Sequence, residues 1–599
     1  MWEVYSFYKA VIMLTTAPMK KIILAFGFIA HTAYPSFAQA VGKPDPGSFY
    51  QAGEPLSKEK INGLFLLGKV WGFLKYFHPQ IAAGRSDWDN ELVAFLPGYS
   101  KTTSKKERSD SLLSWINRQG AVPKKKAGSY DGIKDAKLNP DFSWISSKNF
   151  YPELVAKLKF ILANRAQGDQ YYIKFERDEG LNIPVFQHEN SYYKNAYPDA
   201  GLRLVSLFRF WNIIEYWYPY KYGLPKSWDE TLKEHVPSVL ESANAEDYTR
   251  DIQKLDAAIQ DGHALVVSKT ARELLGYYYM PFTISCIRND FFVSVVTNDS
   301  LAAVAGIQRG DIIDAIDGIS MKEIIQQKLP FIQASTLAYA KLELARDLNK
   351  TTKPTVTLSV KRNRKIIELT VTNFFTKKMT DRFKPVLSFQ KDSSFCMLQN
   401  KIAYLNMGKL KAKDSLHFTR LIAASDALIL DLRQNMIENG EERNPFGIIF
   451  SLLGDGPSPN TLSTPQPDFA GVFKLLDSQY TPKIPVVYHY RKNIVILINE
   501  AVISVGETMT MAFSRTYNAV LMGSNTSGTD GMNSMVMLPG NITAGFTGTG
   551  SYWSNGKNTE RVGIAPDIKI YPTIAGYIRD KDELVEKAVD YLSKKINGK

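Results

Sequence analysis

The stretch from residue 493 to residue 513 reads NIVILINEAVISVGETMTMAF, and it decides the fold expected for this chain. Residues 494–498 form a continuous apolar run with β-branched side chains, which predicts a strand buried on both faces. After residues 499–500 the apolar positions follow helical spacing, so Ser504 lies where a strand turns into a helix. A hydroxyl at a helix N-terminus lies near free N–H groups and the positive end of the helix dipole, which stabilise a developing oxyanion. Ser504 is therefore a candidate nucleophile.

The same turn also has a purely structural interpretation. Ser504 and Glu507 have the spacing of a capping box, in which the serine caps the helix and the glutamate reaches back to it. The local pattern leaves both interpretations open, so the remainder of the chain has to decide between them.

Composition narrows the function classes. The chain has 599 residues and 44% hydrophobic content, enough for several domains with packed cores. Its net charge of +13 is spread out, with one tight run at residues 124–126, which is typical of a solvated surface and not of a nucleic-acid site. The two cysteines, Cys286 and Cys396, allow one disulfide or two thiols. The sequence contains no Cys-x-x-Cys or His-Glu-x-x-His spacing, so neither a metal site nor a cofactor is expected.

Residues 1–40 are expected to be a signal peptide with an upstream extension. A charged segment begins at Met19, residues 22–30 are apolar, and residues 36–38 have the small-residue pattern of a cleavage site. No later apolar segment has the length of a membrane span.

A helical N-terminal region is expected over residues 41–270, and it contains a repeat. Seven residues of a unit at about 61–97 recur at a constant offset of 140 in a unit at about 201–237. They are Trp71, Tyr76, Pro79, Trp88, Asp89, Leu92 and Pro97, which return as Trp211, Tyr216, Pro219, Trp228, Asp229, Leu232 and Pro237. This pattern predicts an internal duplication of a helix pair. The helical spacing of the aromatic residues favours a packed core over a ligand groove.

His263 differs from the other histidines because it lies in an Asp-Gly-His turn between a helix, expected at about 247–258, and a strand-like segment. An imidazole is suited to general-base chemistry near neutral pH. A lone histidine in a turn is more often structural, so this pattern alone does not assign it to catalysis.

The region expected over residues 271–375 resembles a PDZ domain. Residues 305–318 read AGIQRGDIIDAIDG, and a hairpin-like pair follows at 355–361 and 365–373. A PDZ domain binds an extended peptide at a sheet edge; the alternative is a small β domain that only packs. From 376 to 599 strands and helices alternate, which predicts an α/β domain with its chemistry at the loops.

In this order, the features resemble the S41 peptidase family of C-terminal processing and tricorn-core proteases, most closely its tricorn-like branch. The motifs are the turn at His263, the PDZ-like region, the DLR of residues 431–433, the Ser504-x-x-Glu507 pair with a Gly/Thr loop, and the segment ERVGIAPD at 560–567. The resemblance covers about residues 200–595. It implies a multidomain α/β protein with a ClpP/crotonase-like catalytic domain, exported to the periplasm or beyond the cell of a Gram-negative bacterium.

The resemblance also implies roles for individual residues. Ser504 matches the family nucleophile, and the backbone N–H of Val505 matches an oxyanion-hole donor. His263 matches the general base, and Glu560 matches the acidic residue that supports the catalytic assembly. The processing proteases use a lysine in the Gly/Thr loop, but Thr529 stands at that position. The expected base is therefore the histidine.

Three positions depart from the family pattern. Gly262 stands where the tricorn pattern has a serine, and Ile437 and Glu438 stand where the family has glycines. The second oxyanion-hole donor is expected to be the N–H of Ile437, although a β-branched residue is disfavoured in a conformation open only to glycine.

The sequence thus predicts a secreted serine endopeptidase that hydrolyses protein or peptide substrates through an acyl-enzyme at Ser504. Substrate C-terminal tails would bind the PDZ-like region. The alternative is a catalytically impaired S41-like protein that binds peptides without cleaving them.

Overall fold

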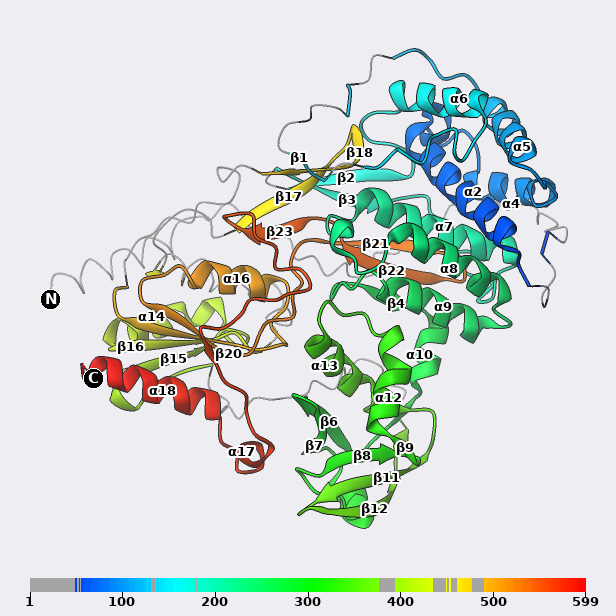
Figure 1. Ribbon diagram of the computed structural model, residues 1–599. Coiled ribbons are helices and arrows are strands. Elements are labelled where there is room, and N and C mark those ends of the chain that lie inside the picture. The colour runs from blue at the N-terminus through cyan, green and yellow to red at the C-terminus, as the bar shows by residue number, and fades with distance from the viewer. Residues whose placement is uncertain are drawn as a thin grey trace.

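The computed structural model describes residues 49–598, except for 51–52, 54, 126–127, 131–132, 134–135, 139, 179, 376–393, 435–448, 450–451, 454–459 and 477–489. The expected signal segment and Ile437 lie outside the described residues. The chain forms a multidomain, mixed α/β protein (Figure 1). Across the described ranges, no helix is both long and apolar enough to cross a membrane.

A six-stranded sheet forms the C-terminal α/β layer, in the order β14-β15-β16-β19-β20-β24. Its strands are β14 (Phe395–Leu398), β15 (Ile402–Asn406), β16 (Ala427–Asp431), β19 (Asn493–Ile498), β20 (Ala519–Gly523) and β24 (Ile568–Lys569). All neighbours are parallel except β14, which pairs antiparallel with β15. The covering helices are α14 (Ser415–Ala424), α16 (Val505–Phe513) and α18 (Glu583–Ile596).

The central strand β19 is buried on both faces, as its continuous apolar sequence predicts. Ile494, Ile496 and Ile498 pack with side chains of α14 and α16. Val495 and Leu497 pack with side chains of α18, which lies on the opposite face of the sheet (Figure 1). Because successive side chains of a strand point to opposite faces, a strand between two helical layers needs apolar residues at every position.

The region between residues 278 and 375 has its own sheet and its own core. The sheet order is β12-β11-β8-β7-β6, with β9 beside β8, and every pairing is antiparallel. The strands are β6 (Phe282–Ile287), β7 (Asp290–Val296), β8 (Ile312–Ile316), β9 (Ile319–Ser320), β11 (Thr355–Arg362) and β12 (Lys365–Thr372). The helices are α11 (Asp299–Ala305), α12 (Met321–Lys328) and α13 (Leu337–Asp347). A small sheet of β5 (Tyr278–Tyr279), β10 (Lys350–Thr351) and β13 (Phe374–Phe375) closes this region. The hairpin expected near residue 363 is confirmed by the β11–β12 pair.

Helices dominate the N-terminal region (Figure 1). They are α2 (Lys58–Phe77), α3 (Pro79–Ala82), α4 (Trp88–Tyr99), α5 (Lys105–Arg118), α6 (Pro152–Ala163), α7 (Ala200–Trp217), α8 (Trp228–Glu241), α9 (Ala245–Ala257) and α10 (Lys269–Leu275). A hairpin of β2 (Ile173–Asp178) and β3 (Leu181–Phe186) lies between α6 and α7 in the chain.

The two helix pairs that carry the sequence repeat, α2–α4 and α7–α8, make the same internal contacts. In the first pair, the indole N–H of Trp71 donates to the carbonyl of Trp88 at 3.1 Å, and that of Trp88 donates back at 3.0 Å. In the second pair, Trp211 and Trp228 exchange the same two bonds at 2.7 and 2.9 Å. All four rings are buried, so these aromatic residues form a core and not a groove.

Ion pairs between the two helix pairs are also reciprocal. Lys69 of α2 pairs with Asp229 of α8 at 2.7 Å, and Arg209 of α7 pairs with Asp89 of α4 at 2.5 Å. Positions 69 and 209 are separated by the same 140 residues as positions 89 and 229. Each unit therefore supplies the cation for the other unit's aspartate.

Two further sheets join the N-terminal and C-terminal parts of the chain. In one, β4 (Leu265–Val267) pairs with β22 (Ile542–Thr547), which pairs with β21 (Asn533–Leu538). In the other, β1 (Ala136–Leu138), β18 (Phe469–Leu475), β17 (Asn460–Gln466) and β23 (Gly550–Trp553) follow in that order. The β4–β22 pairing carries the turn with His263 into the C-terminal part of the molecule. The last helices of the chain are α17 (Ile574–Ile578), which packs against β7, and α18.

Candidate active site

Ser504 lies in a strained turn between β19 and α16. Its backbone has φ 58° and ψ −124°, a left-handed conformation that costs about 1–3 kcal/mol for a residue with a side chain. Its side chain accepts no hydrogen bond from the first turn of α16. The capping-box interpretation is therefore wrong, because a capping serine has an extended backbone and bonds to the helix N–H groups. A strained strand-to-helix turn is the geometry that presents a nucleophilic serine in other hydrolases.

Glu507 reaches away from the helix N-terminus, to the Gly/Thr loop. One carboxyl oxygen accepts hydrogen bonds from the Thr526 hydroxyl and from the N–H of Gly528, the latter at 2.6 Å. Complete burial raises the pKa of this carboxyl well above its usual value, because burial disfavours the charged form. Glu507 therefore holds the loop that follows β20 against α16.

Thr529 of that loop joins the serine turn to the histidine turn. Its carbonyl accepts a hydrogen bond from the N–H of Ser504 at 2.7 Å, and its hydroxyl accepts one from the N–H of Gly262 at 2.8 Å. A Cβ placed on Gly262 would lie 2.8 Å from the Thr529 hydroxyl oxygen and 3.1 Å from the Ile503 side chain. The turn that carries His263 thus packs against the residue before Ser504. A side chain at position 262 would therefore crowd the Thr529 hydroxyl.

His263 is held by Asp261, which precedes β4, and by Thr547 of β22. Its Nδ1 lies 3.0 Å from the hydroxyl oxygen of Thr547, and its backbone N–H donates to Asp261 at 2.8 Å. Asp261 also accepts from the Thr547 hydroxyl at 2.9 Å and from the Thr547 N–H at 2.6 Å. Burial lowers the pKa of His263 below its usual value, and the nearby charge of Asp261 partly opposes this effect. The imidazole is therefore neutral at pH 7, as a general base must be.

Ser504 and His263 are brought together through Thr529, but they make no direct hydrogen bond in the part of the chain that the structure describes. Ser504 is 3% exposed and His263 is 8% exposed. Catalytic hydrogen bonds are often long in the absence of substrate, so this arrangement is compatible with a nucleophile and its base.

Glu560 is buried near the site without contacting the histidine. It is 1% exposed, and neither carboxyl oxygen has a hydrogen-bond partner among the described residues. Burial, followed by the negative charge of Asp261, raises the pKa of Glu560 well above its usual value. The structure therefore does not bring its carboxyl into hydrogen bonding with His263.

The N–H of Val505 is available beside Ser504. It is the first N–H of α16, and no hydrogen bond described in the structure uses it. A free helix N-terminal N–H next to a nucleophile can bind an oxyanion. The other expected donor, Ile437, lies outside the described residues.

A segment of the 278–375 region covers these turns. The Ser335 hydroxyl donates to the carbonyl of Ser527 at 2.6 Å, and Tyr339 of α13 packs with Ile503. The Tyr339 ring would lie 3.1 Å from a Cβ on Gly262. The loop before α13 and α13 itself therefore pack against residues next to Ser504 and His263 in the chain.

Sequence patterns did not identify Thr547 or Thr529 as partners of the two candidate residues. Thr547 is 284 positions from His263, so only the strand pairing reveals the contact. Asp261 carried a local signal, because it lies in the same Asp-Gly-His turn.

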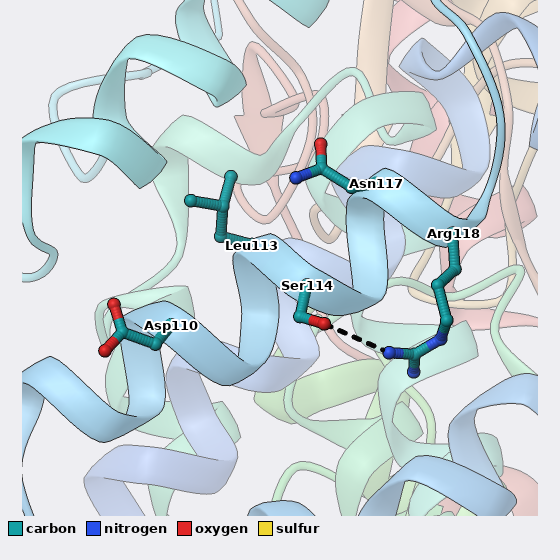
Figure 2. Close-up of a pocket in the computed structure, with 5 residues that line it drawn as sticks. All are labelled: Asp110, Leu113, Ser114, Asn117 and Arg118. Carbon is teal, nitrogen blue, oxygen red and sulfur yellow. Dashed lines mark hydrogen bonds between the residues drawn. The ribbon is translucent and has the colours of Figure 1, made fainter.

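No group of three or more metal-binding side chains is found in the described ranges. A shallow pocket elsewhere is formed by one helix, α5, as Figure 2 shows. It is lined by Asp110, Leu113, Ser114, Asn117 and Arg118. None of these residues belongs to the candidate site.

Comparisons with known proteins concern the family and the fold of the chain. Residues 401–570 match the model of Peptidase family S41. No curated protein matches the sequence. A structure of mature CPAF complexed with lactacystin is similar at TM-score 0.53 and 13% identity, over 67% of this chain and 99% of that chain. Another structure of mature CPAF has a TM-score of 0.52 and 14% identity, over 67% of this chain and 98% of that chain. The tricorn protease has a TM-score of 0.33 and 14% identity, over 73% of this chain and 43% of that chain. At such identities the CPAF structures support the fold alone.

Proposed function

This chain belongs to the S41 peptidase family of serine peptidases, and on that premise we propose that it is an exported endopeptidase that cleaves proteins or peptides through an acyl-enzyme at Ser504. The observation that carries the proposal is the strained turn at Ser504, which Thr529 links to the turn of a buried, neutral histidine. A strained backbone persists only where the surrounding structure holds it, and such residues cluster at functional sites.

In the proposed reaction, His263 takes the proton of the Ser504 hydroxyl as the serine oxygen attacks a peptide carbonyl. The same imidazole then protonates the leaving amine, and water later cleaves the acyl-enzyme with the histidine again as base. The N–H groups of Val505 and Ile437 would bind the oxyanion, and each such donor contributes roughly 10²–10³ in turnover. Glu560 would act on the electrostatics of the site and not by direct contact with the base.

The region 271–375 is proposed to be a PDZ-like domain that docks the C-terminal tails of substrates. Support comes from its antiparallel sheet and from α13, which lies against the serine turn. Docking at this domain would thereby be coupled to access to Ser504. A peptide with a free C-terminal carboxylate should be cleaved faster than its amidated twin, and equal rates would contradict the docking role.

The reciprocal tryptophan bonds and crossed ion pairs support a further proposal, that the helix pairs α2–α4 and α7–α8 arose by duplication. Export is proposed from the sequence of residues 1–40 alone. N-terminal sequencing of the exported protein should find a chain that begins after Ala38, whereas retention of residues 1–38 would contradict it.

The alternative function is peptide binding without cleavage. The replacement of the family glycines by Ile437 and Glu438, and the covered state of Ser504, favour it. Incubation with an unfolded protein, followed by mass spectrometry of new termini, distinguishes the two. Internal cuts by the wild type that Ser504→Ala and His263→Ala both abolish are expected for the endopeptidase. Tight binding without cuts would establish the alternative.

A further inference from the structure

We propose that Thr547 and Asp261 are positioning residues for His263, which fix its ring orientation and the nitrogen that carries its proton. This inference rests on the proposed role of His263 as the base. It assigns to a threonine hydroxyl the place that a carboxylate occupies beside the histidine of a Ser-His-Asp triad.

Strand pairing sets the position of Thr547. In the β4–β22 ladder Leu265 lies opposite Gly545, and continuing this antiparallel register by two residues places His263 opposite Thr547. Both Thr547 and Asp261 are fully buried. The strand pairing therefore brings the two residues opposite each other just beyond β4, where their side chains meet.

The donor and acceptor roles follow from the contacts of Asp261. Backbone N–H groups can only donate, and those of His263 and Thr547 donate to the two oxygens of this carboxyl at 2.8 and 2.6 Å. With both oxygens acting as acceptors, the Thr547 hydroxyl donates its single proton to Asp261 at 2.9 Å. The Thr547 oxygen, 3.0 Å from Nδ1, is then left to accept from the imidazole.

This assignment leaves the proton on Nδ1 and a lone pair on Nε2. A general base needs that lone pair to remove the serine proton. In the reaction the Ser504 proton moves to Nε2 while the serine oxygen bonds to the carbonyl carbon. It then moves from Nε2 to the leaving nitrogen as the C–N bond breaks. The Nδ1 proton stays hydrogen-bonded to the Thr547 oxygen throughout. Asp261 stabilises the imidazolium through the Thr547 hydroxyl.

Glu560 does not compete for this position, because its carboxyl has no hydrogen-bond partner in the described structure. Of the described residues, only Thr547 contacts a ring nitrogen of His263.

The test compares Thr547→Val, which removes the hydroxyl, with Thr547→Ser, which keeps it. Thr543→Val on the same strand is the matched control. The rate of labelling of Ser504 by a fluorophosphonate is followed by intact mass from pH 5 to 9, after circular dichroism has confirmed folding. We expect Thr547→Val to lower the rate by about 10- to 10²-fold. We also expect a lower midpoint of the acidic limb, because the imidazolium loses its acceptor. Thr547→Ser and Thr543→Val should keep the wild-type rate and midpoint.

A Thr547→Val variant with the wild-type rate and midpoint would overturn the inference. If the wild type labels elsewhere, or if His263→Ala labels normally, the proposed function itself fails. The inference is then decided on the wild type by ¹⁵N NMR of the histidine rings, with the His263 signals assigned by their absence in His263→Ala. A ring protonated at Nδ1 supports it, whereas a ring protonated at Nε2 overturns it.

Discussion

Glu507 provides the sharpest test of how the site is held, because leucine and glutamine at this position should behave differently. Leucine removes the oxygen that accepts from Thr526 and Gly528. Each buried donor left without a partner costs about 1–3 kcal/mol. The added apolar burial of leucine returns about 1–2 kcal/mol. We expect Glu507→Leu to destabilise the loop at residues 526–529 by roughly 1–4 kcal/mol.

Glu507→Gln should be much milder, because the glutamine oxygen still accepts both bonds, and burial, which raises the pKa of the native carboxyl, already disfavours its charged form. The pH dependence has a defined sign. The folded-state pKa lies above the unfolded value of about 4.3, so the wild type loses stability as pH rises from there toward the folded pKa. The glutamine variant lacks this loss, so its stability relative to the wild type should rise with pH in that window.

Hydrogen exchange of peptides covering residues 524–531, read by mass spectrometry between pH 5 and 8, measures this local opening. The leucine variant should exchange about 5- to 10³-fold faster than the wild type at equal pH. The glutamine variant should exchange at about the wild-type rate, or more slowly than the wild type at the higher pH. Equal exchange in the two variants would refute the role given to Glu507.

Three further predictions concern other buried groups. Arg209→Met leaves Asp89 without its buried cation and should lower the unfolding free energy by about 3–5 kcal/mol, seen in urea titrations; a change below about 1 kcal/mol would contradict the pairing. Burial lowers the pKa of His263 from its usual 6.5, so the pH midpoint of the acidic limb of fluorophosphonate labelling should lie below 6.5; a midpoint above 6.5 would contradict the burial. Burial raises the pKa of the Cys286 thiol to about 12, so iodoacetamide at pH 8 should modify Cys396 in the native protein and spare Cys286 until unfolding; modification of native Cys286 at the same rate as Cys396 would contradict this burial.

Local patterns predicted the elements of the fold well where burial is simple. The apolar run at residues 494–498 predicted a strand buried on both faces, and β19 lies between two helical layers. The repeat at an offset of 140 predicted two helix pairs in which Trp-Asp opens the second helix, and α4 and α8 begin at these tryptophans. The capping-box alternative failed because the tertiary contact of Glu507 with the Gly/Thr loop outweighs the local bond to Ser504.

The partners of the candidate residues could not be predicted from local pattern. Thr547 meets His263 only because β22 pairs with β4. These strands lie far apart in the sequence, so no local residue spacing indicates the contact. Gly262 appeared to be a departure from the family, yet its lack of a side chain makes room for the Thr529 hydroxyl. A position that breaks a family pattern can thus be explained by the residue packed against it.

The most direct test of the account is fluorophosphonate labelling of the purified mature chain, compared among wild type, Ser504→Ala and His263→Ala. The account predicts a single adduct on Ser504 in the wild type and loss of labelling in both variants, because the serine needs the histidine to become nucleophilic. Folded wild-type protein that does not label, or a His263→Ala variant that labels at the wild-type rate, would contradict it.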